Sequence, residues 1–392
     1  MISLGQLFFV FLKIGATAFG GNVALVAAVR KELCEKKHYL KDAQVLDFMT
    51  LGNLMPGPLA VNVVAAIGYT LRGMLGAIVA TIAVLIPSFF LVSFLADMYF
   101  RYGSSPVVNE IFSGLLPGVC AIIAATAWSL AKKNISSVLQ VGIVVLAGAA
   151  ILFFHGFLTT LVIIAVSGLL GLFLIRKKEG PEFMGPPKEK YSPWPLVAMT
   201  VLVLAGIILW LIHPEGEHAQ KTRLLGLSFG GMSVTLFGGG YVFIPAIEKV
   251  VVGMHHWVTS KEFADGIAMG QVTPGPISIS AAFIGWRVAG FLGALVSTVA
   301  IFFPPAFLMV VAQQFVDRVK KHPVAEAVFS GVRPAVIGMI VASVYVLSKS
   351  SPLDWQAFFI FAFVLTLSVW KNVDSALLIL ASGFFGWALH LF

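Results

Sequence analysis

The chain has 392 residues, of which 59% are hydrophobic and only 11% are charged. A soluble domain carries about 25% charged residues, so the composition excludes an ordinary soluble globular protein. The formal net charge of +8 does not indicate a nucleic-acid partner, because the Lys and Arg residues lie in short clusters between apolar segments, where membrane topology places them. We therefore expect an integral membrane protein with many spans, whose surroundings are the lipid bilayer, and no nucleic acid among its partners.

Several classes of site are not indicated by the sequence. The N-terminus lacks a basic region followed by a small-residue cleavage site, so its first apolar stretch is predicted to be a retained helix. Cys34 and Cys120 form no disulfide framework. The histidines lack metal-ligand spacing with a cysteine, and no Walker A motif for ATP occurs. We expect no metal, no cofactor and no enzymatic activity.

The first predicted helix covers about residues 5–29 and carries Gly20 and Gly21 in its middle. Glycine weakens a helix interior, so we expect a break there. A polar connection and an amphipathic stretch over about residues 42–55 lead to the Pro-Gly-Pro motif at residues 56–58. Proline removes a backbone donor and clashes with the preceding turn, which predicts a second break. A short apolar segment and four further helices complete this half.

The region after the first half differs in composition. Residues 176–195 are rich in Pro, Gly and charge, which predicts a solvated linker. An apolar segment over residues 194–213 follows and has no counterpart in the first half. We therefore divide the chain into an N-terminal repeat (1–175), a linker with one unpaired transmembrane segment (176–221), and a C-terminal repeat (222–392).

The second half repeats the plan of the first. The sequence TAFGGNVA at residues 17–24 returns as TLFGGGYV at residues 235–242. The second Pro-Gly-Pro motif follows the first at the same offset, and Gly290 follows Gly73 at an offset that is shorter by a single residue. A single-residue gap over about a hundred residues indicates a duplication.

The orientation of the halves depends on how the Pro-Gly-Pro regions cross the membrane. Counted as broken spans, they give about thirteen spans and inverted halves, as in many secondary transporters. Counted as re-entrant segments, they give parallel halves. The basic clusters of the first half favour the second count and those of the second half favour the first. We favour inverted repeats, in an all-α polytopic membrane protein with broken or re-entrant helices.

The breaks predict a binding site for an anion. Irregular backbone survives at membrane depth only where it is buried in protein or lines a wet cavity. A helix that starts after each motif would direct free N–H groups and a positive dipole end inward, and neighbouring amides and hydroxyls can donate to oxyanion oxygens. The alternative is that the motifs are only kinks and that the glycines permit close helix packing. The candidate substrate-binding residues are Asn53, Pro56, Gly57, Pro58 and Asn62 in the first half, Gln271, Thr273, Pro274, Gly275, Pro276 and Ser278 in the second, and Gly20, Gly21, Gly238 and Gly239 at the helix breaks.

These motifs resemble those of the chromate ion transporter family. The resemblance consists of FGG in the first helix, Pro-Gly-Pro after an acidic amphipathic stretch, IGY or IGW, and a later GxxPxV that begins at Gly331. It covers nearly the whole chain, in the long form with two homologous halves. It implies a secondary transporter of the bacterial or archaeal inner membrane that extrudes chromate, with sulfate as the look-alike anion, and oppositely oriented halves. Asn22 departs from the pattern, because a proline is common there in the family.

A few ionisable residues lie in apolar or repeated segments. Lys13 and Arg333 lie within apolar stretches, where ionisable groups are costly and usually face a cavity. They are candidate substrate contacts, with snorkelling to the membrane interface as the alternative. Asp47 and Asp265 are repeated acids, and Glu248 ends the broken helix of the second half. If transport is coupled to protons, these acids are candidate carriers; otherwise they lie on a solvated helix face.

We expect secondary active transport of a divalent tetrahedral oxyanion across the inner membrane, with chromate efflux as the leading interpretation. Chromate and sulfate share charge and shape, so a sulfate or other oxyanion transporter, including one for uptake, is the alternative. A membrane-embedded enzyme would need clustered acids or a nucleophile–base pair, which the motifs do not provide, and a passive channel is a further alternative. A homodimer is compatible with the sequence.

Overall fold

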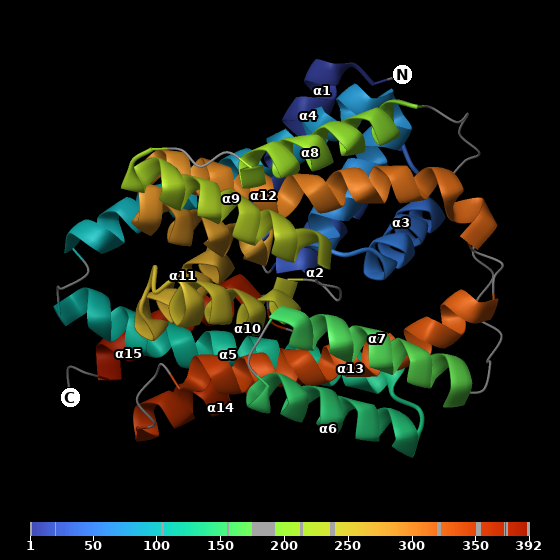
Figure 1. Cartoon of the computed structure of the whole chain (residues 1–392). Helices are drawn as coiled ribbons and strands as arrows, with labels where there is room; N and C mark the ends of the chain where they lie inside the picture. Colours follow the sequence, from blue (N-terminus) through green and yellow to red (C-terminus); the bar gives the residue numbers. More distant parts are fainter. Residues whose placement is uncertain are drawn as a thin grey trace. The chain divides into compact units, whose positions relative to one another are not determined.

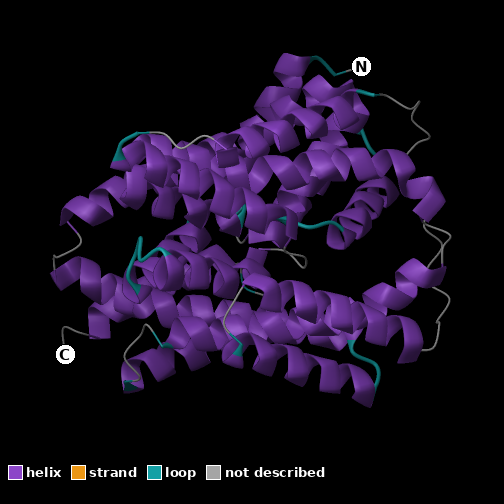
Figure 2. Cartoon of the chain, viewed as in Figure 1, coloured by secondary structure: helices purple, strands orange, loops and turns teal. Residues whose placement is uncertain are grey.

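The structure is a computed structural model, and it is helical throughout the part of the chain that it describes, with no β-strand there (Figure 2). The described residues are 2–19, 21–102, 106–154, 157–174, 193–211, 215–235, 240–319, 323–349, 354–371, 373 and 375–389. The predicted linker over residues 176–195 lies almost entirely outside these ranges. The all-α prediction is confirmed.

The first half contains two broken helical segments and then longer helices. Its elements are α1 (Leu4–Thr17), α2 (Gly21–Arg30), the π-helix η1 (Lys31–Lys36), α3 (Asp42–Leu54), α4 (Leu59–Tyr102), α5 (Pro106–Asn134), α6 (Val138–Phe153) and α7 (Phe157–Leu174). The predicted breaks fall between α1 and α2 and between α3 and α4.

The second half begins after an additional helix, α8 (Trp194–Leu211), which accounts for the unpaired apolar segment. The remaining elements are α9 (Glu217–Thr235), the 3-10 helix η2 (Gly240–Val242), α10 (Phe243–Glu248), the π-helix η3 (Lys249–Met254), α11 (Ser260–Val272), the 3-10 helix η4 (Ile277–Ile279), α12 (Ser280–Val319), α13 (Pro323–Ser348), α14 (Trp355–Lys371) and α15 (Ser375–Leu389). Both halves therefore place a π-helix before the amphipathic helix that precedes Pro-Gly-Pro.

The helices form two compact units. The first unit consists of Met1–Ser93, Lys178–Gly240 and Pro274–Ala325, and the second of Phe94–Lys177, Tyr241–Thr273 and Glu326–Phe392. In the first unit α8 and α9 pack along α12, and in the second α14 and α15 pack along α5 (Figure 1). The compact units differ from the sequence repeats, because each unit contains segments of both repeats.

The chain reverses direction between α1 and α2. The Lys13 ammonium group lies 2.9 Å from a carboxylate oxygen of Glu32, although nineteen residues of continuous helix would separate these positions by about 28 Å. The two side chains together cannot bridge such a distance, so the segment that precedes the break and the segment that follows it lie side by side. This first broken element is therefore a helical hairpin.

A second reversal occurs at the first Pro-Gly-Pro motif. A side-chain Cβ at Gly52 would lie 3.3 Å from a methyl group of Val63, which requires α3 and the start of α4 to run next to each other. The Pro-Gly-Pro motif at residues 56–58 is the turn between them. This helical hairpin is the geometry that the re-entrant count assumes.

Helix α4 itself contains a third reversal. The backbone of Arg72 and Gly73 is not helical, with φ of −148° and +63°. The turn divides α4 into two arms. A Cβ at Gly68 on the first arm would overlap the carbonyl oxygen of Gly76 on the second arm, so the two arms touch through their backbones. The second half repeats the arrangement, because Gly290 has φ of +57° and a Cβ at Gly285 would overlap Gly293.

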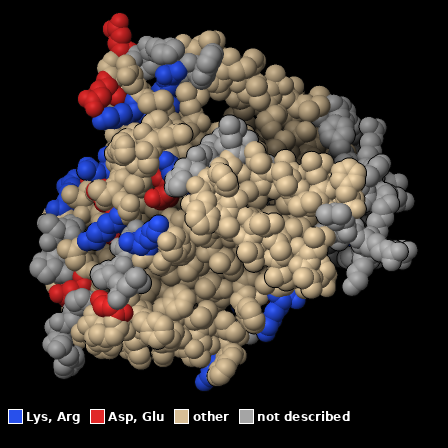
Figure 3. Space-filling model, turned by 60° about the horizontal axis from the view of Figure 1, so that its bottom comes forward, with Lys and Arg blue, Asp and Glu red and all other residues tan. Residues whose placement is uncertain are grey.

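The surface and the helix lengths agree with a membrane setting. Four described segments are long and apolar enough to cross a bilayer, namely Leu59–Tyr102, Val107–Lys132, Ile277–Gln314 and Ser330–Ser348. Charged side chains lie mainly toward the left of the face in Figure 3, and most other described atoms of that face belong to uncharged residues. Large apolar side chains such as Phe90 and Leu146 are exposed, which fits contact with lipid tails rather than with water.

Replacing Gly68 by Leu tests the contact between the two arms of α4. The added side chain would overlap Gly76, and overpacking of this kind typically costs about 1–3 kcal/mol. We expect less monodisperse protein in detergent and a lower Tm, measured by fluorescence-detected size-exclusion chromatography after heating.

The matched control is Gly142→Leu, because a Cβ at Gly142 meets no atom within 4 Å. Equal Tm values for the two variants would contradict the close approach of the two arms.

Candidate functional site

Both Pro-Gly-Pro turns belong to the first compact unit. Gly57 has φ of +96° and Gly275 has φ of +111°, a left-handed backbone region in which a Cβ is unfavourable. Each turn therefore requires glycine at its centre. The flanking prolines cannot donate a backbone hydrogen bond, which limits the number of donors that the turns must satisfy.

The first turn packs against the long helix of the other repeat. A Cβ at Gly57 would overlap the ring of Pro305 on α12 and would lie 3.4 Å from the carbonyl oxygen of Ser233 on α9. The turn of the first repeat thus fits against two helices of the second repeat.

The second turn makes the reciprocal contact. A Cβ at Gly275 would lie 2.9 Å from the hydroxyl oxygen of Ser88 on α4, and the Gly275 N–H donates to the carbonyl oxygen of Ala18 at 2.9 Å. Ser88 and Pro305 directly follow the paired prolines Pro87 and Pro304, so they are equivalent positions of the two repeats. Each turn therefore rests on the equivalent position of the opposite repeat.

Buried polar side chains follow each turn. Asn62 is fully buried and its Nδ2 donates to the carbonyl oxygen of Pro56 at 2.8 Å. Ser280, the equivalent of Asn62 in the second repeat, is also buried, as is Ser278. The Asn62 Oδ1 and both serine hydroxyls find no hydrogen-bonding partner within the described part of the chain. Buried polar atoms normally have partners, so these atoms mark the region after the turns as one suited to a polar ligand.

The remaining candidates around the second turn lie in the second unit. Gln271 is buried beside the Tyr241 hydroxyl. The Thr273 hydroxyl is also buried and donates to the carbonyl oxygen of Gly270 at 3.3 Å, so it already has a backbone partner.

Other candidates fall partly or wholly outside the described residues. Gly20, Gly238 and Gly239 are not described, and neither is the side chain of Asn53 on α3. Gly21 is the first residue of α2. The roles predicted for these residues stay predictions.

The acids proposed for coupling have different surroundings. Asp265 on α11 is buried and accepts a hydrogen bond from the Tyr99 hydroxyl at 2.6 Å. Asp47 on α3 is also buried. Glu248 ends α10 and is half-buried, and Arg333 is half-buried near the start of the span Ser330–Ser348.

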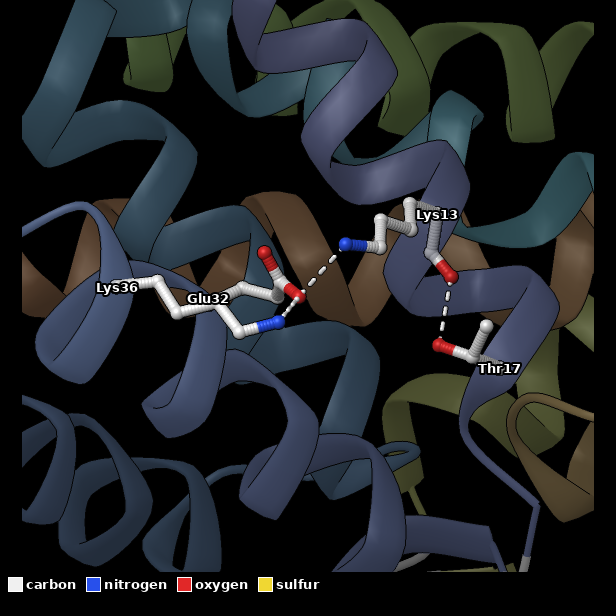
Figure 4. Close-up of polar contacts among 4 residues, drawn as sticks. All are labelled: Lys13, Thr17, Glu32 and Lys36. Atoms are coloured by element: carbon white, nitrogen blue, oxygen red, sulfur yellow. Dashed lines mark hydrogen bonds and ion pairs between the residues drawn. The ribbon is translucent and has the colours of Figure 1, made fainter.

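Lys13 belongs to a charged cluster. Its ammonium group donates to Oε1 of Glu32 at 2.9 Å, and the Lys36 ammonium group donates to the same oxygen at 2.8 Å (Figure 4). Glu32 is buried at 8% exposure. The Thr17 hydroxyl donates to the carbonyl oxygen of Lys13 at 2.8 Å one helical turn further on. The cluster joins α1 to the π-helix η1.

The two lysines stabilise the ionised form of Glu32. Hydrogen bonds from Lys36 and Lys13 hold the pKa of the Glu32 carboxyl below its ordinary value, although its partial burial acts in the opposite direction. A charge taken partly out of water needs such partners. The cluster as a whole carries one net positive charge.

Five residues with notable contacts are not indicated by the sequence motifs, namely Ser88, Pro305, Glu32, Lys36 and Tyr99. Pro304 follows Pro87 at the same offset as Gly290 follows Gly73, so a comparison of the repeats also pairs Ser88 with Pro305. Glu32 and Lys36 have the i,i+4 spacing of a helical ion pair. No local pattern joins Tyr99 to Asp265, because 166 residues separate them.

Comparison with known proteins assigns the family. The model of the chromate transporter family matches residues 5–172 and 223–387, which are the two repeats. The chain belongs to the chromate transporter family. It is therefore an integral membrane protein of an ion-transporter family, and its division into two homologous repeats is confirmed.

Three relatives in this family cover most of the chain. A probable chromate transport protein of Synechococcus elongatus is 32% identical over 94% of this chain and 90% of its own. The chromate transport protein of Cupriavidus metallidurans is 31% identical over 90% of this chain and 84% of its own. An uncharacterized transporter of Methanocaldococcus jannaschii is 29% identical over 98% of this chain and 94% of its own. No solved structure matches the fold of this chromate transporter family member.

The ion pairs of Glu32 predict a pH dependence of stability. Because the folded pKa of Glu32 is lowered, its contribution to stability is complete above the ordinary glutamate pKa of about 4.3 and is lost as the pH falls through the folded pKa. We expect the Tm of the natural protein to exceed that of Glu32→Gln at pH 7 and the difference to shrink below about pH 4. A difference that does not change with pH would contradict an ionised Glu32.

The contact between Gly275 and Ser88 predicts coupled stability effects. Gly275→Ala places a Cβ at φ of +111°, which costs about 1–2 kcal/mol, and brings it against Ser88. We expect Gly275→Ala to lower the Tm, and to lower it less in a Ser88→Gly background, where the contact is absent.

The control for this cycle is Gly231→Ala, because a Cβ at Gly231 meets no atom within 4 Å. Its cost should be the same in both backgrounds. An unchanged cost of Gly275→Ala in the Ser88→Gly background would show that the two residues do not touch.

Proposed function

We propose that this protein is a secondary active transporter that exports chromate across the inner membrane. The observation that carries the proposal is the pair of reciprocal Pro-Gly-Pro turns in a chain of the chromate transporter family. The turns interrupt helices at equivalent positions, and the buried hydroxyls of Ser278 and Ser280, which have no partner among the described residues, follow the second turn. A hydroxyl is a neutral donor that can bind an oxyanion and still release it.

The geometry of the first repeat supports oppositely oriented repeats. The α1–α2 hairpin and the hairpin formed by α3 and the first arm of α4 each return to the side on which they start. The crossings between equivalent points of the two repeats are then the second arm of α4, α5, α6, α7 and α8, which is an odd number. An odd number of crossings inverts the second repeat, as in many secondary transporters.

The positive-inside rule is compatible with this count. It places Lys132 at the end of α5, Arg318 near the end of α12 and Lys371 at the end of α14 on the same side as the lysines of η1. Basic residues accumulate on the cytoplasmic side. With the broken segments counted as re-entrant, basic residues of both halves gather on that side, while Lys221 and Arg223 near the start of α9 fall on the other side.

Energy for export comes from the membrane potential or from a proton gradient. Moving one charge across 100 mV is worth about 2.3 kcal/mol, so expelling a dianion from an inside-negative cell gains about twice that amount. Among the candidate coupling acids, Asp265 is both buried and hydrogen-bonded to a named partner, Tyr99. A buried carboxyl group can serve as a proton carrier.

Transport of sulfate or another oxyanion, including uptake, is the second candidate. It follows from the same neutral donors, which recognise charge and shape rather than the central atom. Competition in reconstituted vesicles separates the candidates. For a chromate exporter, unlabelled chromate inhibits the flux of labelled chromate at lower concentration than sulfate, molybdate or phosphate does.

Export predicts that cells that produce this protein accumulate less labelled chromate than cells that carry an empty vector. Gly57→Val should abolish the difference, because the side chain would overlap Pro305, while membrane insertion is retained. Gly253→Val serves as the control, since a Cβ at Gly253 meets no atom within 4 Å.

Accumulation and membrane abundance are measured in the same cells. Unchanged accumulation with the natural protein present in the membrane would contradict export. Full activity of Gly57→Val would move the transport path away from the Pro-Gly-Pro turns.

A further inference from the structure

We propose that Lys13 and Lys36 form an oxyanion-binding position that the Glu32 carboxylate occupies in this structure, so that a soluble oxyanion binds there by displacing Glu32. The proposal takes its ligand class, a tetrahedral oxyanion, from the proposed function. It assigns to this cluster a competition between an internal and an external anion.

The geometry of the cluster is that of a shared anion. Both ammonium groups lie within 2.9 Å of one atom, Oε1 of Glu32. Each ammonium group has three N–H donors, so most of their donors are not used by this oxygen. A sulfate-like dianion carries more acceptor oxygens and twice the charge of the carboxylate, and it can engage both lysines with several hydrogen bonds.

The accessibility of the three side chains suits an exchange. The side chains of Lys13 and Lys36 are 57% and 49% exposed, whereas that of Glu32 is 11% exposed. The ammonium groups are therefore more accessible than the carboxylate that they hold between them (Figure 4). Without Glu32 the two lysines would carry an uncompensated charge of +2, which favours an incoming dianion.

The second repeat shows that the fold does not need these charges. At the offset of the two Pro-Gly-Pro motifs, the positions equivalent to Lys13, Glu32 and Lys36 are Gly231, Val250 and Met254.

The neutral part of the cluster is nevertheless present in both repeats. Thr17 and Thr235 are equivalent, and each donates to the backbone carbonyl four residues earlier at 2.8 Å. The helix ends are thus built alike in both repeats, and the charged triad is an addition to only one of them.

The test measures thermal stabilisation of the full chain in detergent by sulfate, with chloride at matched ionic strength as the reference. A ligand that binds the folded state raises the Tm by an amount that grows with the ratio of its concentration to its dissociation constant. We expect Glu32→Gln to reach the same sulfate-specific rise in Tm at about tenfold lower sulfate than the natural protein, because the internal competitor is removed; tenfold corresponds to about 1.4 kcal/mol.

Matched variants separate competition from a general change of charge. Lys13→Gln and Lys36→Gln should lose most of the sulfate-specific shift. Asp42→Asn removes an acid that pairs with Arg30 on the same segment at 3.0 Å but lies outside the cluster, and it should behave like the natural protein. If Glu32→Gln folds poorly, Glu32→Asp withdraws the carboxylate by one methylene and should give a smaller shift in the same direction.

Two results would overturn the proposal. One is that Glu32→Gln needs as much sulfate as the natural protein, or more, for the same rise in Tm. The other is a pair of results with phosphatidylglycerol: the lipid abolishes the effect of sulfate, and it stabilises Glu32→Gln by itself. This pair would identify a lipid headgroup as the occupant.

The chromate accumulation assay keeps this proposal separate from the proposed function. Sulfate binding with the expected order of variants, in a protein that does not lower chromate accumulation, would leave the binding position standing and reject export. Normal export with no sulfate-specific stabilisation in Glu32→Gln would support export and reject the binding position.

Discussion

The need of every backbone N–H and C=O group for a partner inside a bilayer governs the rest of this structure. Helices satisfy that need within themselves, so each interruption must be compensated by neighbouring protein. At the second Pro-Gly-Pro turn, the Gly275 N–H bonds to the carbonyl oxygen of Ala18, where α1 has just ended. At the first turn, the Asn62 amide bonds to the carbonyl oxygen of Pro56. The second interruption is therefore satisfied by the end of α1, and the first by the helix that follows it.

The same need explains why the reversals are made of glycine. Within α4, the arms on either side of Gly73 approach until Gly68 and Gly76 leave no room for a side chain. Such contact removes lipid from both backbones and gives close dispersion contacts, which drive helix association in membranes where the hydrophobic effect does not. The repetition of this contact at Gly285 and Gly293 shows that the reversal is part of the plan of the repeat.

Much of this architecture follows from the sequence, because repeated motifs carry their own geometry. The Pro-Gly-Pro breaks, the glycine interruption after α1 and the duplication were all predictable from spacing. The direction of the chain after each break was not, since a kink and a hairpin have the same local residues. Contacts such as Gly52 with Val63 decide between them, and these depend on packing across the turn. The pairing of Lys13 with Glu32 was hidden for the same reason, because it exists only if α1 and α2 fold back on each other.

Each Pro-Gly-Pro turn packs against the opposite repeat, and this limits how such a protein can be assembled. Gly57 of the first repeat rests on Pro305 of the second, and Gly275 of the second rests on Ser88 of the first. Neither repeat contains the surface against which its own turn packs. A polypeptide of one repeat would be incomplete at its most sensitive point, and two such polypeptides would have to supply that surface to each other. Fusion of the repeats into one chain keeps the two contact surfaces together permanently. It also allows the two contact positions to differ, so that one is Ser88 and the other is Pro305.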